Sequence, residues 1–246
     1  MLTRVRDQEL MDNPLLDSKE HVHALEGLAR LNAVSGAART VWRPIRRLYQ
    51  QHFATAGGAG YQPRPRAIRI LDVACGSGDI ALSLADIAAN AGIEIRVDGC
   101  DISQVAVNNA NERASRHGYD CKFFQLDALR DGLPADYDVI TNSLFMHHLS
   151  EEEAAGLLRK MCDATKALVV VHDLVRSPAS LMLVTLACRT LTRSSVVHFD
   201  GPASVRAAFT PVELRAIAQR ANVYDATVTD AFPCRMLLTW RKRDSV

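Results

Sequence analysis

A short segment around residue 75 combines an acidic strand end, two closely spaced glycines and the start of a helix. Residues 70–81 read ILDVACGSGDIA, in which an apolar run ends at Asp72 and a helical spacing of apolar residues begins at Ile80. Gly76 and Gly78 let the loop backbone pass close to a ligand, and the helix start offers N–H groups that lack a partner within the helix. Such a loop binds nucleotide-like ligands.

The charges around this loop distinguish two kinds of nucleotide ligand. Residues 76–81 fit the G-x-G-x-x-G/A pattern of dinucleotide-binding proteins, whose pyrophosphate is anionic. Asp72 and Asp79 would repel that anion. S-adenosylmethionine (SAM) has no phosphate, and its amino group and sulfonium are attracted to nearby carboxylates. The charges therefore favour SAM, and a nicotinamide oxidoreductase stays an alternative.

Residues 66–246 resemble a class I SAM-dependent methyltransferase of the small-molecule type, and the glycine loop is similar to that of quinone-biosynthesis and polyketide-tailoring methyltransferases. The resemblance implies that Asp101 binds the ribose hydroxyls, for which a carboxylate offers two acceptor oxygens. It also implies that Asp127 and Ala128 contact the adenine. Ala74 departs from the family, which has a glycine there. The predicted cofactor set is Asp72, Ala74, Gly76, Gly78, Asp101, Ile102, Asp127, Ala128 and Asn142.

Strand and helix patterns alternate through the rest of the sequence. This alternation predicts an α/β fold, a doubly wound and mostly parallel seven-stranded sheet of the Rossmann-like methyltransferase kind. The family resemblance implies that a final hairpin adds an antiparallel strand. Capping signals at Ser103, Ser150 and Thr210 mark helix starts. The predicted strands are residues 68–72, 93–101, 122–126, 137–141, 167–173, 224–230 and 235–240.

The N-terminal part of the chain is predicted to be a separate helical cap. We expect residues 1–62 to form this cap and residues 63–246 to form the SAM-binding domain, with glycines and prolines in residues 57–66 as a linker. Helical periodicity covers about residues 18–53, and Pro44 marks the second helix's start or a kink. Trp42 and Tyr49 share one helix face, and we expect them to contact the substrate.

A second variable segment, about residues 176–210, is predicted to be a lid insertion. The helix within residues 178–191 carries apolar residues on nearly all sides, so something must cover it. This helix is expected to form a lid, a dimer interface or ordinary core. If the protein is a homodimer, we expect the contact to involve the 178–191 helix or the N-terminal helices. His198 follows in the same insertion and is expected near the substrate.

Candidate catalytic groups follow the fourth and fifth predicted strands. Methyl transfer is an in-line displacement, so positioning supplies much of the catalysis. A phenol has a pKa of about 10 and benefits from a base. His148 and His147 are the candidate bases, and Asp173 would orient a histidine or bind a substrate hydroxyl. No carboxylate cluster indicates a metal. Residues 142–145 read NSLF and lack the paired prolines of many amino-group methyltransferases, which disfavours nucleobases as acceptors.

Composition narrows the class of partner. There are 29 Lys and Arg residues against 28 acidic ones, which favours no nucleic acid or other polyanion. Six cysteines without a C-x-x-C pair indicate reduced thiols, and no apolar run approaches the roughly 20 residues of a membrane span. We therefore expect a cytoplasmic enzyme.

The sequence as a whole predicts a SAM-dependent methyltransferase. Its acceptor would be a small apolar, phenolic, quinone-like or polyketide-type molecule, with O-methylation slightly favoured over C-methylation. One alternative is an RNA or protein methyltransferase, for which Arg39, Arg43, Arg46 and Arg47 would supply the basic face. Another is a non-catalytic SAM-binding regulatory subunit.

Overall fold

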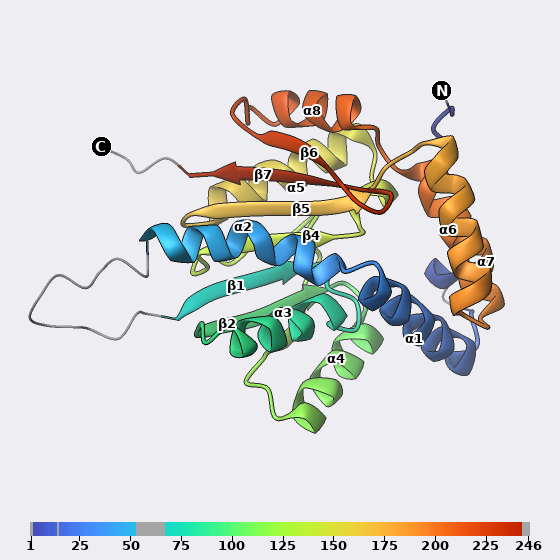
Figure 1. The fold of residues 1–246 in the computed structure, drawn as a ribbon, viewed down its shortest axis with the longest axis horizontal. Coiled ribbons are helices and arrows are strands. Elements are labelled where there is room, and N and C mark those ends of the chain that lie inside the picture. Colours follow the sequence, from blue (N-terminus) through green and yellow to red (C-terminus); the bar gives the residue numbers. More distant parts are fainter. Residues whose placement is uncertain (1, 14, 53–66, 243–246) are drawn as a thin grey trace, which may run out of the picture.

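A single seven-stranded sheet runs through the computed structural model, which describes residues 2–13, 15–52 and 67–242 (Figure 1). The strand order is β3-β2-β1-β4-β5-β7-β6, and β7 alone runs in the direction opposite to the other six strands. This confirms the predicted doubly wound fold with its closing hairpin. The strands are β1 (Ile68–Val73), β2 (Ile95–Asp101), β3 (Phe123–Gln125), β4 (Val139–Ser143), β5 (Leu168–Leu174), β6 (Thr227–Ala231) and β7 (Arg235–Arg241).

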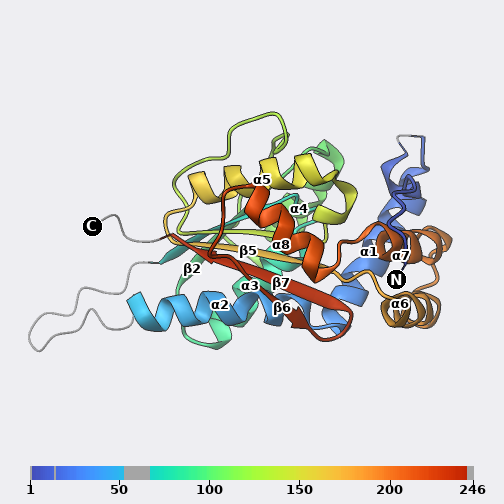
Figure 2. The same ribbon diagram turned by 90° about the horizontal axis from the view of Figure 1, so that it is seen from above.

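Helices cover both faces of the sheet, which explains why the central strands are apolar almost throughout. All seven residues of β5 are buried, as expected for a strand with a helical layer on each side. One layer contains α2 (Ala37–His52), α3 (Asp79–Asn90) and α4 (Gln104–His117). The other contains α5 (Glu151–Ala164) and α8 (Pro211–Arg220), so that α2 and α5 lie on opposite sides in Figure 2.

The two N-terminal helices have different positions, and a single helical cap over residues 1–62 stays a prediction. Helix α1 (Ser18–Val34) lies beyond the C-terminal ends of the strands, whereas α2 lies along a sheet face (Figure 1). Val41, Trp42 and Ile45 of α2 belong to the core. Pro44 lies inside α2 and does not mark its start. The expected helix end at residue 53, the linker at 57–66 and the domain boundary at 62–63 fall outside the described residues.

The 176–210 segment forms two helices at the same end of the sheet as α1. These are α6 (Pro178–Leu191) and α7 (Ser195–Ala207), and α7 also packs against η1 (Leu10–Asp12) (Figure 1). The outer side of α6 leaves Met182 and Leu186 exposed, so a homodimer through this face stays a prediction. Of the helices that the structure describes, none has the length and apolar character needed to cross a membrane.

Candidate active site

A cavity of about 430 Å³ lies between the glycine loop and the helices at the C-terminal ends of the strands. In an open α/β sheet this is the edge where ligands bind. The floor comes from the loop after β1 and from the ends of β4, β5 and β7, and the cover comes from α1, α6 and α7. Most of the wall is apolar, and its larger side chains include Leu25, Leu28, Leu31, Leu144, Leu183 and Leu191.

The glycine loop has a left-handed backbone at three positions. The φ angles of Ala74, Gly76 and Gly78 are +54°, +54° and +72°. Gly78 is also required by packing, because a Cβ there would lie 2.7 Å from the ring of Phe123. Ala74 adopts the same conformation without being glycine, which preserves the loop's path despite the departure from the family pattern. The guanidinium of Arg113, on α4, donates to the Ser77 carbonyl at 2.7 Å and holds the loop against that helix.

Asp101 ends β2 and holds the glycine loop through its own side chain. One carboxylate oxygen accepts the N–H of Gly76 at 2.8 Å, and the other accepts the N–H of Ser103 at 2.9 Å. A carboxylate has about four lone-pair sites, so each oxygen keeps one for another donor. Ser103 in turn caps α4 through the N–H of Ala106. Asp101 itself does not line the cavity.

The other predicted nucleoside contacts lie along the same outer edge. Ile102 is 63% exposed, and the side chain of Asp127 accepts the N–H of Leu129 at 3.0 Å. Ala128 is buried next to it. None of these residues lines the cavity, and neither does Asn142, whose amide donates to the carbonyl of Val73 at 2.8 Å. The predicted cofactor residues therefore divide between the cavity floor and the open ends of β2 and β3.

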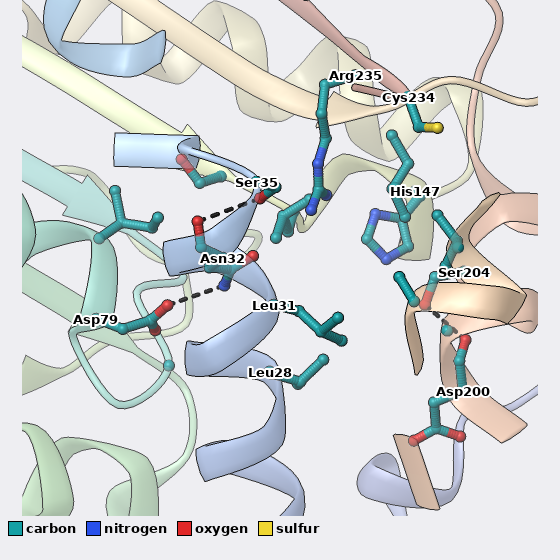
Figure 3. A pocket seen from close by; sticks show the side chains of 18 of the residues that line it. Leu28, Leu31, Asn32, Ser35, Asp79, His147, Asp200, Ser204, Cys234 and Arg235 are labelled. Carbon is teal, nitrogen blue, oxygen red and sulfur yellow. Dashed lines mark hydrogen bonds between the residues drawn. The ribbon is translucent and has the colours of Figure 1, made fainter. Parts of the chain in front are cut away.

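Asp72 is a buried carboxylate at the cavity floor. Its Oδ1 accepts a hydrogen bond from Thr141 at 2.7 Å, and the two residues are paired across β1 and β4. Burial raises the pKa of Asp72 to about 7; the Thr141 hydrogen bond opposes this, while Asp79 and Asp101 add to it. Asp79 accepts from the amide of Asn32 on α1 at 2.9 Å (Figure 3). Three carboxylates thus surround the loop.

The residues at this floor fit SAM and do not fit a pyrophosphate. The hydroxyls of Ser77 and Ser143 are buried, line the cavity and have no hydrogen-bond partner in the described part of the chain. Asp72 would hold the amino group of SAM, whose positive charge stabilises the ionised carboxylate. These two serines would satisfy further polar atoms of its amino-acid part. A pyrophosphate would be repelled by the carboxylates of Asp72 and Asp79, which line this floor.

His147 and Asp173 form a buried pair, and His147 lines the cavity. Nδ1 of His147, in η2 (Met146–His148), lies 2.7 Å from Oδ1 of Asp173, near the end of β5. Burial lowers the pKa of His147, but the charge and hydrogen bond of Asp173 outweigh it, and the net pKa is raised. Burial likewise raises the pKa of Asp173, but His147 outweighs this effect, and its net pKa is lowered.

His148 also lines the cavity. Burial, followed by the charge of His147, lowers the pKa of His148 to about 3, so its imidazole is neutral. Its ring centroid lies 4.3 Å from that of His147. Of the two histidines ranked as bases in the sequence, His147 therefore has the better orienting partner.

The segment before α1 reaches the histidines, which the sequence did not indicate. The guanidinium of Arg4 donates to the carbonyls of His147 and Leu149 at 3.1 and 2.8 Å. A carboxylate oxygen of Glu9 lies 3.8 Å from Nε2 of His147 and the other 3.9 Å from Nε2 of His148. The ligand atoms of these three side chains lie within 4.8 Å of one another, an arrangement that could hold a divalent cation. Residues 2–13 contain no motif that points to this placement.

The three predicted substrate contacts, Trp42, Tyr49 and His198, lie away from this cavity. Trp42 is only 6% exposed and packs into the core beneath α2, and Tyr49 packs against the same core. His198 lies on α7 with Nε2 at 3.1 Å from the carbonyl of Thr192. None of the three lines the cavity. Trp42 and Tyr49 lie on α2, which runs along the sheet face. The ring of His198 points to Thr192, in the turn between α6 and α7.

The strand order, the glycine loop after β1 and the acidic end of β2 are those of the class I SAM-dependent methyltransferase fold, with SAM as the cofactor. Residues 70–167 match the family model described as a methyltransferase domain. A curated protein, the 27-O-demethylrifamycin SV methyltransferase of Amycolatopsis mediterranei (strain S699), is 33% identical over 109 residues. That match covers 41% of this chain and 38% of the relative, so the chain aligns with well under half of that protein.

Solved structures share the fold over nearly the whole chain. Magnesium protoporphyrin IX methyltransferase from Synechocystis PCC 6803, with bound S-adenosylhomocysteine (SAH), has a TM-score of 0.55 and 14% identity over 95% of this chain and 91% of its own. A putative O-methyltransferase from Nostoc punctiforme PCC 73102 has a TM-score of 0.61 and 16% identity over 96% of this chain and 65% of its own. At these identities the likeness concerns the fold.

Proposed function

We propose that this protein is an enzyme that methylates a hydroxyl group on a small, largely apolar acceptor of phenolic, quinone-like or polyketide type. The observation that carries the proposal is the His147–Asp173 pair, buried at a cavity whose wall is mostly apolar. A hydroxyl must lose its proton to become a good nucleophile, and a buried imidazole held by a carboxylate is suited to take it. The printed activity of the rifamycin relative, an O-methylation, supports oxygen over carbon.

His147 has the geometry of a general base. Its Nδ1–H donates to Asp173, which leaves the lone pair of Nε2, on the side of Glu9, to accept the acceptor's hydroxyl proton. Asp173 fixes the tautomer and stabilises the imidazolium that forms. Bound SAM supplies a methyl carbon activated by its sulfonium. The acceptor oxygen would attack that carbon with SAH as the leaving group, and Nε2 of His147 would keep the hydroxyl proton.

The apolar wall from α1 and α6 gives this chain its acceptor specificity and excludes water. Leu28 and Leu31 come from α1, and Leu183 and Leu191 come from α6. Aromatic or polyketide surfaces gain free energy by leaving water for such a wall. A macromolecular acceptor is less well supported, because the arginines of α2 lie on its exposed side and none lines the cavity.

The test separates cofactor binding from chemistry. SAH binding is measured by isothermal titration, and methyl transfer from SAM is measured on a panel of phenols and hydroxyquinones. We expect His147→Asn to bind SAH within about twofold of wild type and to lose about 10²–10⁴-fold in kcat/KM. His148→Ala should lower turnover less. His198→Ala, outside the cavity, is the control and should keep full activity. Normal turnover by the His147 variant would refute its role as base.

A further inference from the structure

One cation lies on the cavity wall, and the proposed mechanism does not use it. Arg235 begins β7 and lines the cavity, and it is the one Lys or Arg residue among the described lining residues. Figure 3 shows its side chain reaching into the cavity beside His147. Among the described residues, no carboxylate oxygen lies within 4.0 Å of its guanidinium, and its N–H groups have no hydrogen-bond acceptor. Five donors in a planar fork are therefore open to a ligand.

The carboxylates of the cavity are already engaged elsewhere. Asp200 accepts the N–H groups of Leu10 and Met11 at 2.7 and 3.1 Å. Asp79 accepts from Asn32, and Asp72 accepts from Thr141. The carboxylate of Glu9 accepts from Ser204 and lies beside the two histidines. The half-buried guanidinium thus has no counter-ion of its own in the described chain. An unpaired cation in a mostly apolar cavity is costly, and a bound anion would remove that cost.

The sheet order places this cation on the acceptor side of the cavity. Arg235 pairs with Leu174 across β5 and β7, next to Asp173. The glycine loop follows β1, and β7 is three strands away in the order β1-β4-β5-β7. At about 4.8 Å per strand, Arg235 starts about 14 Å from the loop that holds the cofactor. Burial lowers the pKa of Arg235 and Asp173 raises it, but a guanidinium stays charged at neutral pH.

We propose that Arg235 binds an anionic group of the methyl acceptor, a carboxylate or an acidic enol, and that it selects for acceptors that carry this group near the reacting hydroxyl. This inference rests on the proposed function and narrows it. The acceptor is an apolar ring system with one negative charge, which lies against Leu28 and Leu31 while its anionic end meets the guanidinium. The paired geometry of a planar guanidinium and a carboxylate gives the contact its direction.

The experiment compares ligands that share a ring system and differ in whether they carry an anionic group, with the protein saturated with SAH. Because SAH is a neutral thioether where SAM has its sulfonium, the cofactor adds no positive charge at that sulfur. The pairs are 2-naphthol against 3-hydroxy-2-naphthoate, and 1,4-naphthoquinone against 2-hydroxy-1,4-naphthoquinone, whose enol is ionised at pH 7.5. We expect wild type to bind the anionic member of each pair at least tenfold more tightly. Equal affinity, or no binding of the anionic members, would overturn the proposal.

Variants at Arg235 test whether this residue causes the preference for anionic ligands. Arg235→Gln should abolish the charge preference and leave SAH affinity unchanged, and Arg235→Lys should keep part of it. If Arg235→Gln still prefers the anions, the proposal is wrong. It is also wrong if Arg235→Gln weakens SAH but not methylthioadenosine, which lacks the carboxylate, because the arginine would then serve the cofactor. The wild-type comparison decides the central point even if a variant does not fold. Failure of the proposed function would instead appear as absent SAH binding or absent methyl transfer.

Discussion

Asp173 holds His147 by both the ring and the backbone. Its Oδ1 lies 2.7 Å from Nδ1 of the imidazole, and its Oδ2 accepts the backbone N–H of His147 at 3.0 Å. Oδ1 also accepts the N–H of Leu174. The carboxylate therefore sets the position of η2 relative to β5 as well as the tautomer of the ring. A substitution that removes its charge has both a chemical and a structural effect, and pH separates the two.

Asp173→Asn should shift the acid limb of activity to lower pH. In wild type the pKa of His147 lies above its ordinary 6.5, because the Asp173 carboxylate outweighs burial. A base must be unprotonated, so kcat/KM rises with pH through that raised pKa. The asparagine variant loses the charge, so the acid limb of its kcat/KM profile should move to lower pH. Its plateau value of kcat/KM should also fall at least tenfold. The measurement is kcat/KM between pH 5.5 and 9. Coincident acid limbs would show that Asp173 does not act on the base.

The same pair predicts how stability changes with pH. The raised pKa of His147 stabilises the fold below pH 6.5, and this contribution is lost as the pH rises through the folded-state pKa. The lowered pKa of Asp173 stabilises the fold above pH 3.8, and this contribution is lost as the pH falls through its folded-state pKa. The stability difference between wild type and Asp173→Asn should therefore be largest between these two values.

Gly78→Ala should cost more stability than Gly118→Ala. Both glycines have nearly the same φ, +72° and +71°, so the backbone strain is the same, about 1–2 kcal/mol. A Cβ at Gly118 meets nothing within 4 Å, whereas at Gly78 it lies 2.7 Å from the ring of Phe123 and 3.2 Å from Ala110. We expect about 1–3 kcal/mol more destabilisation at Gly78. Urea unfolding of the two variants measures the difference, and equal losses would mean that Phe123 moves away freely.

Asp101→Ala should weaken SAH binding, and Asp98→Ala should not. Asp101 accepts the N–H groups of Gly76 and Ser103, so its removal loosens the glycine loop as well as the predicted ribose contact. Asp98 accepts from the hydroxyl of Tyr137 and the N–H of Lys122 instead, away from the loop. Both variants lose hydrogen bonds to a charged group, each worth about 1.5–3 kcal/mol. We expect more than tenfold weaker SAH binding for Asp101→Ala alone. Normal SAH affinity in that variant would exclude Asp101 from the cofactor site.

Asp72 should make SAH affinity depend on pH near neutrality. Its pKa of about 7 means that the free protein is half protonated there, mainly because the carboxyl is buried. Only the ionised form pairs with the ammonium of SAH, so affinity should rise about tenfold from pH 6 to pH 8. Asp72→Asn should bind SAH more weakly and without this dependence. Titration at several pH values, in buffers of different ionisation enthalpy, measures the slope and the proton release. Parallel pH profiles for the two proteins would assign the dependence to another group.

Local patterns predicted the elements well because each pattern is a property of consecutive residues. The predicted first strand, residues 68–72, ends one residue before β1 does. The predicted fifth strand, residues 167–173, begins and ends one residue before β5 does. The capping boxes at Ser150 and Thr210 are present with both of their hydrogen bonds. The glycine loop could be recognised for the same reason, since strand end, glycines and helix start lie within twelve residues.

Contacts between distant segments could not be read in this way. The spacing of Trp42 and Tyr49 shows that α2 has an apolar face, but it does not show which surface that face meets. In the structure it meets the sheet, and the apolar face of α1 lines the cavity instead. The histidine pair was found as a motif, but the preference for His147 over His148 depends on which of them Asp173 reaches.

The sequence by itself determined the order of strands and helices, the SAM loop and the candidate bases, because each depends on residues close together in the chain. The tertiary structure alone decided that Glu9 from one end and Arg235 from the other lie at the same cavity as His147. That meeting depends on the insertion of β7 between β5 and β6 and on the packing of residues 2–13 against α7. Both result from burial of apolar surface between distant segments, which no local spacing encodes.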